Sequence, residues 1–173
     1  DSHDLEQTQQ NVQTLIQETN MNESEREEFL NRFVVNPTQT LVGFCVLGGI
    51  FSEGIDLRGE RLIGTAIVGV GLPQVNPEQE LIKDYFNTKN NRGFEYAYQL
   101  PGMNKVLQAA GRVIRDATDQ GVVLLLDTRF NTPRYRGLFP QHWQHHQVLY
   151  QSKQLKQAIN QFWLEKGTKK QGM

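Results

Sequence analysis

A glutamine, a glycine and two arginines occur at a spacing that suits phosphate binding. Gln108, Gly111, Arg112 and Arg115 stand at i, i+3, i+4 and i+7, so a continuous helix would place all four on one face. Two guanidinium groups one turn apart can donate paired hydrogen bonds to phosphate oxygens and neutralise charge during phosphoryl transfer. The alternative is a pair of surface ion pairs with acids four residues further along, worth about 0.2–0.5 kcal/mol each. That alternative leaves the glutamine and the glycine unexplained.

A second group of candidate residues directly follows an apolar run. The run Leu41–Leu47 is continuous, and the segment from Gly48 to Asp56 reads Gly-Gly-Ile-Phe-Ser-Glu-Gly-Ile-Asp. Ligands of open α/β sheets bind beyond the carboxyl ends of the strands, where glycines allow backbone amides to approach closely. An ordinary glycine-rich turn, followed by an aspartate that caps a helix, is the alternative.

The elements that must position these residues alternate between strands and helices. Continuous apolar runs predict strands at residues 41–47, 62–70 and 121–126, and residues 12–17 are a fourth candidate strand. Amphipathic patterns with capping residues predict helices at 22–33, 78–86, 103–115 and 152–166. Apolar runs without alternation are typical of strands buried on both faces. The sequence therefore predicts an α/β fold with a mostly parallel central sheet between two helix layers.

The polar segment 87–102 is predicted to be a loop or an insertion. Phe94, Tyr96 and Tyr98 alternate within it, which favours a half-buried extended segment. A stacking platform for single-stranded bases is the alternative.

Composition limits the classes of site. The formal net charge is −1, so any surface for a polyanion must be local, and Lys and Arg are frequent between Lys83 and Arg136. The single cysteine, Cys45, excludes an internal disulfide and an all-cysteine metal site, and we expect it to be buried. His142, His145 and His146 lack an accompanying carboxylate, so we expect an exposed helix there and no metal site.

The ends and the absence of long apolar stretches suggest a cytoplasmic location. No run approaches the ~20 apolar residues of a membrane-spanning helix, and residues 1–13 do not resemble a signal peptide. We expect residues 11–166 to form one lobe whose sheet begins partway through, with residues 1–10 and 167–173 as frayed ends.

A nucleotide bound here would need a second protein surface. The chain has no GxxxxGK[ST] phosphate loop and no Asp-Glu pair at the end of a strand to hold magnesium. We therefore expect this chain alone not to hydrolyse ATP.

Two segments together resemble helicase motifs. Gly-Gly-x-x-Ser-Glu-Gly-Ile-Asp at 48–56 and Gln-x-x-Gly-Arg-x-x-Arg at 108–115 resemble motifs V and VI of superfamily-two helicases. Gly-Val-Gly-Leu-Pro at 69–73 and Asp-Thr-Arg-Phe at 127–130 narrow the resemblance to the DinG/XPD branch. The resemblance covers roughly residues 12–140, and it implies a RecA-like α/β sandwich that acts as the second helicase lobe.

The resemblance also implies roles for individual residues. Arg112 and Arg115 resemble the catalytic fingers that reach the γ-phosphate. The other residues expected to bind ATP are Gln108, Gly111, Asp56, Glu53 and Gly54. The residues expected to touch the phosphates of the translocating strand are Gly48, Gly49 and Ser52.

The implied partners are a nucleotide, a second lobe and DNA. ATP and Mg²⁺ would lie against the first RecA-like lobe of the same polypeptide, and single-stranded DNA would be translocated 5′ to 3′. An iron–sulfur cluster would belong to that first lobe and not to this segment. Two other hypotheses remain: a helicase-derived module that binds nucleic acid or protein without catalysis, and a small-molecule enzyme of doubly wound fold. The second lacks a dinucleotide fingerprint, because Gln74 stands where Gly69-Val-Gly71 would need a third glycine.

Overall fold

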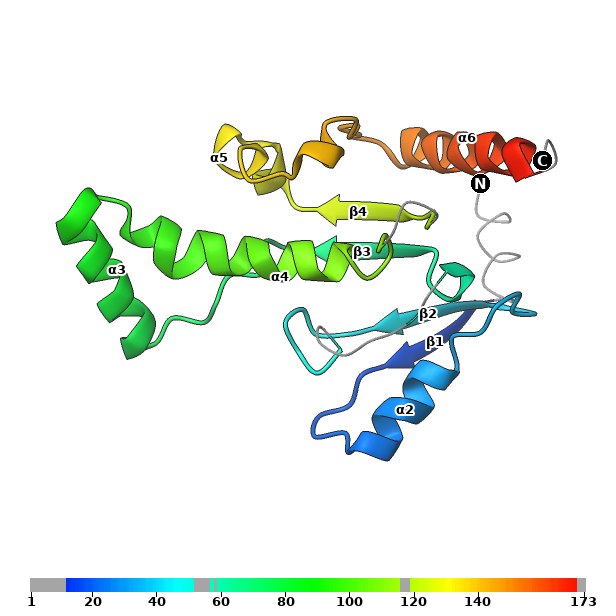
Figure 1. The fold of residues 1–173 in the computed structure, drawn as a ribbon, viewed down its shortest axis with the longest axis horizontal. Coiled ribbons are helices and arrows are strands. Elements are labelled where there is room, and N and C mark those ends of the chain that lie inside the picture. Colours follow the sequence, from blue (N-terminus) through cyan, green and yellow to red (C-terminus); the bar gives the residue numbers. More distant parts are fainter. Residues whose placement is uncertain (1–11, 52–56, 58, 116–118, 171–173) are drawn as a thin grey trace. The chain divides into compact units, whose positions relative to one another are not determined.

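The computed structural model of this chain describes residues 12–51, 57, 59–115 and 119–170. Contacts divide it into two compact units, residues 1–127 and 128–173, and each unit is described by itself. The main elements of the first unit are β1 (Val12–Ile16), α2 (Glu23–Asn31), β2 (Thr40–Phe44), β3 (Gly64–Val68), α3 (Pro77–Asn90), α4 (Leu100–Ala110) and β4 (Val122–Leu126) (Figure 1). Shorter turns of helix lie at Gly59–Arg61 and, as the π-helix η2, at Glu95–Gln99. The second unit contains α5 (Pro133–Arg136), α6 (Ser152–Lys170) and 3₁₀ turns at Thr128–Asn131 and Gln141–Trp143.

All four described strands are parallel to their partners. β1 pairs with β2 in the register Val12 to Thr40, and β3 pairs with β4 in the register Gly64 to Val122. In Figure 1 the arrowheads of both pairs point to the same side of the unit. The prediction of a mixed α/β fold with parallel strands is confirmed, since each predicted apolar run contains one of these strands.

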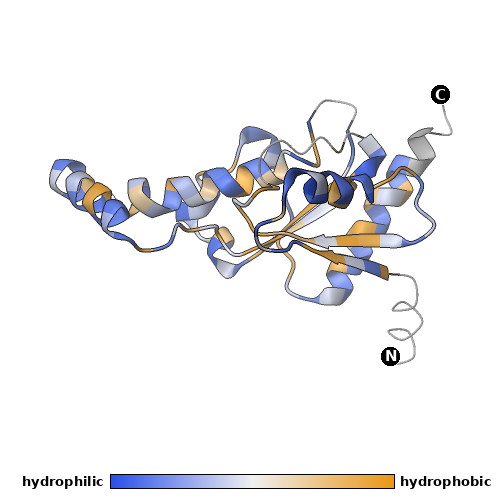
Figure 2. Cartoon of the chain, turned by 90° about the horizontal axis from the view of Figure 1, so that it is seen from below, coloured by the Kyte–Doolittle hydropathy of each residue, from blue (hydrophilic) through white to orange (hydrophobic). Residues whose placement is uncertain are grey.

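In β2 and β3 the odd-numbered face is more buried than the even-numbered face, whereas β4 is half-buried on both faces up to Leu125. Ile67 is 4% exposed, whereas its neighbour Val68 is 76% exposed, and Ile16 and Phe44 also lie open on the even-numbered face. The prediction of burial on both faces is therefore wrong for the even-numbered face of β2 and for Val68 of β3. Cys45 is also exposed, contrary to expectation, because it comes just after the end of β2. Apolar residues nevertheless line the strands, as the orange stretches of Figure 2 show.

Helix α2 covers the other face of β2. Asn22 begins the helix with a capping box, in which its side chain and that of Glu25 each accept a backbone N–H. The rings of Phe29 and Phe33 lie over Gly43, where an added Cβ would sit 2.8 Å from Phe33 Cζ. Arg61 holds the C-terminal end of α2, because its guanidinium donates to Leu30 O in the last turn and to Phe33 O just beyond the helix.

The segment predicted to be a loop is helical. α3 continues to Asn90, and η2 leads without interruption into α4. The ring of Phe86 on α3 stacks on Tyr96 of η2 at 4.2 Å, and Tyr98 is buried. The prediction of an extended segment is thus wrong, because packing of rings between α3 and η2 stabilises helical backbone here.

A chain of aromatic rings organises the second unit. Phe130 contacts Tyr135 edge-on at 6.2 Å, and Phe139 contacts Trp143 at 5.3 Å. Phe130 and Tyr135 are buried, so these rings form the small core of the unit. Helix α6 confirms the predicted C-terminal helix and continues to Lys170.

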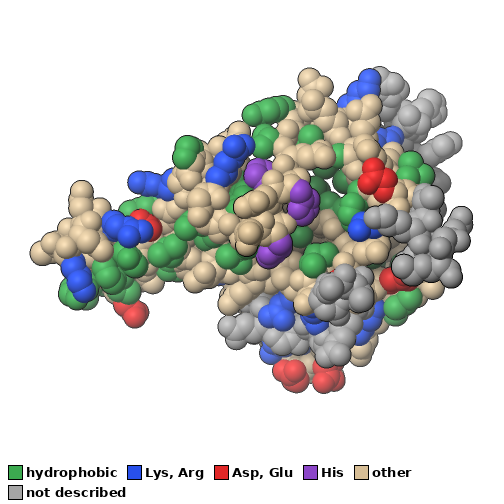
Figure 3. Space-filling model, turned by 45° about the horizontal axis from the view of Figure 1, so that its top comes forward, with side chains coloured by type: hydrophobic (Ala, Val, Ile, Leu, Met, Phe, Trp, Pro, Cys, Tyr) green, Lys and Arg blue, Asp and Glu red, His purple; other side chains and the backbone are tan. Residues whose placement is uncertain are grey.

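The three histidines of the second unit lie at its surface. His142 is in the 3₁₀ turn Gln141–Trp143, and His145 and His146 follow it. All three are exposed, as expected, and are shown in purple in Figure 3, but the backbone forms a short turn rather than a regular helix. In the described part of the chain, no cluster of three metal-ligating side chains occurs and no helix is both long and apolar enough to cross a membrane.

Candidate functional site

The candidate site lies where β2 and β3 end. Gly48 follows β2 with φ +79°, and Gly71 follows β3 with φ +65°, a region of backbone conformation that favours glycine. Gln17, just after β1, steadies the β2 end: its side-chain oxygen accepts from Val46 N at 2.9 Å, and its own N–H donates to Phe44 O. Hydrogen bonds thus join the carboxyl ends of β1 and β2, and Gly71 after β3 lies against Leu47, the residue before Gly48. Ligands of parallel sheets bind at this edge.

Helix α2 anchors the start of the glycine-rich loop. Arg26 donates a 3.0 Å hydrogen bond to the carbonyl oxygen of Ile50. Phe51 is 4% exposed and stacks on Phe29 with ring centroids 4.5 Å apart. The loop at 48–51 is therefore fixed at its far end by a buried ring and a charged hydrogen bond. The sequence prediction identified this loop but not the two α2 residues that hold it.

Helix α4 packs directly on the loop after β3. An ideal Cβ at Gly102 would lie 2.6 Å from Val70 O, and one at Gly71 would lie 2.9 Å from Gly102 O. The Gly71 position also meets Leu47, the last apolar residue before the glycines of the β2 loop, at 3.0 Å. Two glycines thus allow helix and loop backbones to approach more closely than any side chain would permit.

The same helix also reaches the loop after β2. The side chain of Lys105 lies over Gly48, with its Cδ 2.8 Å from where a Cβ would stand. α4 therefore brings the segment before Gln108 into contact with the first glycine of the other predicted motif. The sequence could have indicated Lys105 as a site residue, because positions 105 and 108 share a helix face at i and i+3.

The helix ends before the two arginines. α4 stops at Ala110, and Gly111 is its C-cap with φ −66° and its N–H bonded to Leu107 O at 2.9 Å. The N–H groups of Arg112 and Val113 then bond three residues back, to Ala109 O and Ala110 O. The predicted continuation of the helix to residue 115 is therefore wrong: the chain tightens into a turn after Ala110, and Val113, 3% exposed, lies in the core.

The predicted site residues are brought together in part. Gln108 and Gly111 are exposed, while Arg112 and Arg115 are half-buried just beyond the helix end. The backbone N–H of Arg115 donates to Asp119 Oδ2 at 2.9 Å, which fixes the turn. Gly48 and Gly49 lie at the strand edge; Ser52, Glu53, Gly54 and Asp56 lie outside the described residues.

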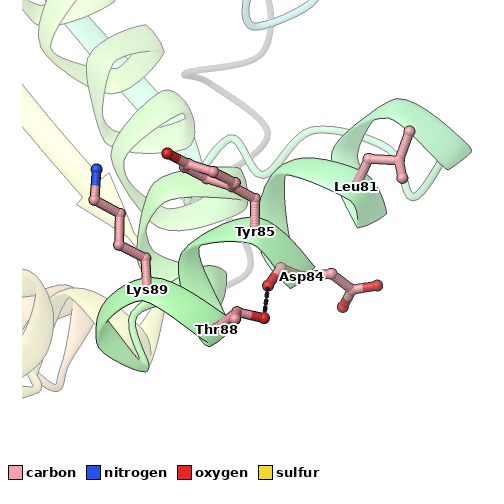
Figure 4. A pocket seen from close by; sticks show the side chains of 5 residues that line it. All are labelled: Leu81, Asp84, Tyr85, Thr88 and Lys89. Atoms are coloured by element: carbon pink, nitrogen blue, oxygen red, sulfur yellow. Dashed lines mark hydrogen bonds between the residues drawn. The ribbon is translucent and has the colours of Figure 1, made fainter.

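A shallow depression elsewhere follows one side of α3. It is lined by Leu81, Asp84, Tyr85, Thr88 and Lys89, all from the same helix (Figure 4). The Lys89 ammonium lies 5.6 Å from the centre of the Tyr85 ring, and Thr88 donates to the backbone of Asp84. Because a single exposed helix supplies every lining residue, this surface lacks the converging groups of a binding site.

Comparison with known proteins identifies the family of this chain. Residues 2–146 match the family described as the helicase C-terminal domain. This chain belongs to that family. It is 35% identical over 88 residues to the ATP-dependent DNA helicase XPD of Sulfolobus acidocaldarius and 35% identical over 89 residues to the ATP-dependent DNA helicase DinG of Photobacterium profundum. These alignments cover 49% and 50% of this chain, and a probable ATP-dependent helicase of Methanocaldococcus jannaschii is 29% identical over 66% of it.

Solved structures support the fold of this helicase C-terminal domain. The structure named XPD_APO superposes with a TM-score of 0.57 and 23% identity, covering 72% of this chain and 25% of the other. The predicted RecA-like fold of the DinG/XPD type is confirmed. The chain spans only 18%, 16% and 13% of the archaeal helicase, XPD and DinG relatives, so it corresponds to one segment of such proteins.

Proposed function

We propose that this helicase C-terminal domain is the second motor lobe of an ATP-dependent DNA helicase. The observation that carries the proposal is the contact of α4 with both strand-end loops. That contact places the helix leading to Arg112 and Arg115 against the loop that starts at Gly48. A nucleotide-facing segment and a nucleic-acid-facing segment that touch can transmit movement from one ligand to the other.

Arg112 and Arg115 would act on the nucleotide. Both are half-buried and follow a helix end on a tight turn, so their backbone positions are defined. When ATP is held by the first lobe, their guanidinium groups would neutralise charge on the γ-phosphate, an effect typically worth roughly 10³–10⁵ in rate. Gln108 and Gly111 would complete the surface facing the nucleotide.

The metal of this reaction would be held outside the described residues. ATP hydrolysis uses Mg²⁺ bound by carboxylates and phosphate oxygens. The part of the chain that the structure describes presents no group of three side chains suited to a metal ion. This domain would contribute arginines, and the first lobe would hold the phosphates and Mg²⁺. The 173-residue chain alone would then fail to hydrolyse ATP.

The glycine loop would contact the translocating strand. Gly48 and Gly49 are at the sheet edge, and the Gly49 N–H already donates to Val46 O at 2.9 Å, so it is the backbone of Gly48 that would approach the phosphates. Opening and closing of the cleft between the lobes would move a single DNA strand past this loop, in the 5′-to-3′ direction. Arg26 and Phe51 would keep the far end of the loop fixed during that movement.

The experiment that tests the proposal uses the full-length protein. Arg112→Ala and Arg115→Ala are compared with Arg32→Ala, an exposed residue at the end of α2, for ATPase activity with single-stranded DNA. We expect a loss of about 10³-fold for the first two and little change for the third. Turnover within threefold of wild type for both finger variants would show that the assignment is wrong. A wild-type protein that binds DNA without hydrolysing ATP would instead be a non-catalytic module.

A further inference from the structure

The side chain of Lys105 occupies the space that a side chain at position 48 would need. An ideal Cβ on Gly48 would lie 2.8 Å from Lys105 Cδ, 3.0 Å from Cε and 3.4 Å from Cγ. Gly48 has φ +79°, so its conformation and this contact both favour glycine. The aliphatic part of the Lys105 side chain thus lies against the backbone of Gly48.

Lys105 differs from three other lysines in that no charged or aromatic partner of its ammonium group is found among the described residues. Lys83 forms a 2.6 Å ion pair with Glu80, and Lys89 and Lys166 lie over aromatic rings. Among the described residues, none forms an ion pair or a hydrogen bond with Lys105. A half-buried lysine side chain whose charge has no protein partner there is suited to receive an anion from outside.

We propose that Lys105 binds a backbone phosphate of the nucleic-acid strand at the Gly48 loop. This inference rests on the proposed function, which places the strand at that loop. The lysine stands five residues before the end of α4, about 7.5 Å along the helix axis from Ala110. Arg112 and Arg115 lie beyond that end, so the helix separates a strand phosphate at Lys105 from the nucleotide phosphates at the arginines.

The experiment measures how single-stranded DNA binding by the full-length protein depends on salt. Lys105→Met removes the charge and keeps an unbranched side chain over Gly48, Lys105→Ala removes both, and Lys105→Arg keeps a cation. Lys153→Met on the exposed start of α6 is the matched control. Affinity for a fluorescent oligodeoxythymidylate is measured at several salt concentrations, together with the ATPase KM for ATP.

The loss of one phosphate contact has a defined signature. For Lys105→Met we expect the slope of log K against log salt to become shallower by about 0.7, and affinity near 0.1 M salt to fall about fivefold. Lys105→Arg and Lys153→Met should keep the wild-type slope, and the KM for ATP should not change. A purely structural role for the lysine would lower stability or activity without changing the slope.

Two results would overturn the inference. One is an unchanged slope in Lys105→Met. The other is a raised KM for ATP with an unchanged slope, which would assign the lysine to the nucleotide phosphates instead. Absence of DNA-stimulated ATPase in the wild-type protein would contradict the proposed function separately, because the salt slope of DNA binding needs no hydrolysis.

Discussion

Gly102 on α4 and Gly71 after β3 touch backbone to backbone. A Cβ on Gly71 would lie 2.9 Å from the carbonyl oxygen of Gly102, and a Cβ on Gly102 would lie 3.1 Å from the carbonyl carbon of Gly71. Real Cβ atoms are not found at the shorter of these distances. This contact fixes how far α4 lies from the strand edge, and therefore where Lys105 and Gln108 stand relative to the glycine loop.

Gly102→Ala should destabilise the domain. The methyl group would meet Val70 O at 2.6 Å, so either α4 or the β3 loop must shift. We expect a loss of about 1–3 kcal/mol in the free energy of unfolding, the usual effect of overpacking, despite the better helix propensity of alanine. Urea unfolding followed by circular dichroism measures this loss.

The matched control for Gly102→Ala is Asn104→Ala. Asn104 is an exposed residue of the same helix, so its replacement should change the free energy of unfolding by at most about 0.5 kcal/mol. Equal stability of the two variants would contradict the close contact between the glycines.

Arg61→Lys should weaken the end of α2. The Arg61 Nε donates to Phe33 O at 2.7 Å, and one terminal nitrogen donates to Leu30 O at 3.2 Å. A lysine cannot present two donors in the same plane, so at least one carbonyl loses its partner. We expect a loss of about 1–2 kcal/mol in thermal or urea unfolding. Arg32→Lys, at an exposed position, serves as the control. A similar loss of unfolding free energy there would show that replacing arginine by lysine destabilises the domain in general, without involving the Arg61 hydrogen bonds.

Strands were predicted well because their signal is local. Each predicted strand segment contains a parallel strand of the structure. These segments can be recognised by counting consecutive apolar residues along the chain, with no knowledge of the fold. The exposure of the even-numbered face was not predictable in the same way. Val68 is as apolar as Ile67, and only the placement of helices on one side distinguishes them.

Helix ends and ring contacts required tertiary information. The spacing from Gln108 to Arg115 fits a helix, but burial of Val113 beside Gly121 favours a turn after Ala110. The stacking of Phe86 on Tyr96 joins residues ten apart through two helices, so alternation along the sequence gave the wrong backbone. In the candidate site, the two motifs were recognised from residue types, whereas the contacts of α4 with both loops depend on the fold.

Gly111→Ala tests whether glycine is needed at this position for folding or for binding the nucleotide. Gly111 has φ −66° and is exposed, so its backbone does not need glycine. An added Cβ would lie 3.2 Å from Leu107 O, a tight contact that small adjustments relieve. We expect the free energy of unfolding to change by less than about 1 kcal/mol, because alanine is also the better helix former.

The ATPase of the full-length Gly111→Ala protein supplies the second measurement. If the nucleotide approaches this backbone, the KM for ATP should rise several-fold while stability is retained. Unchanged kinetics would remove Gly111 from the proposed nucleotide surface without affecting Arg112 or Arg115.

Tyr98 should remain protonated to unusually high pH. Its hydroxyl donates a 2.6 Å hydrogen bond to Glu80, and this bond to a carboxylate, with some desolvation, raises the pKa of Tyr98 to about 12. Hydrogen bonds from Lys83 and then Tyr98 lower the pKa of Glu80. Spectroscopic titration of phenolate absorbance should therefore show one tyrosine that ionises well above pH 10. Glu80→Gln should move that transition back toward 10, whereas Glu78→Gln, exposed on the same helix, should not.

The hydrogen bond between Glu80 of α3 and Tyr98 of η2 should consequently stop stabilising the fold at both low and high pH. A raised tyrosine pKa means that its stabilising effect is complete below the ordinary value of 10 and is lost as pH rises toward 12. A lowered glutamate pKa means that its effect is present above the ordinary value of 4.5 and is lost as pH falls through the lower folded value. Thermal unfolding measured across pH should show both losses in wild type. Glu80→Gln should remove the acid-side loss that depends on this carboxylate, and an unchanged acid limb in that variant would contradict the pairing of Glu80 with Lys83 and Tyr98.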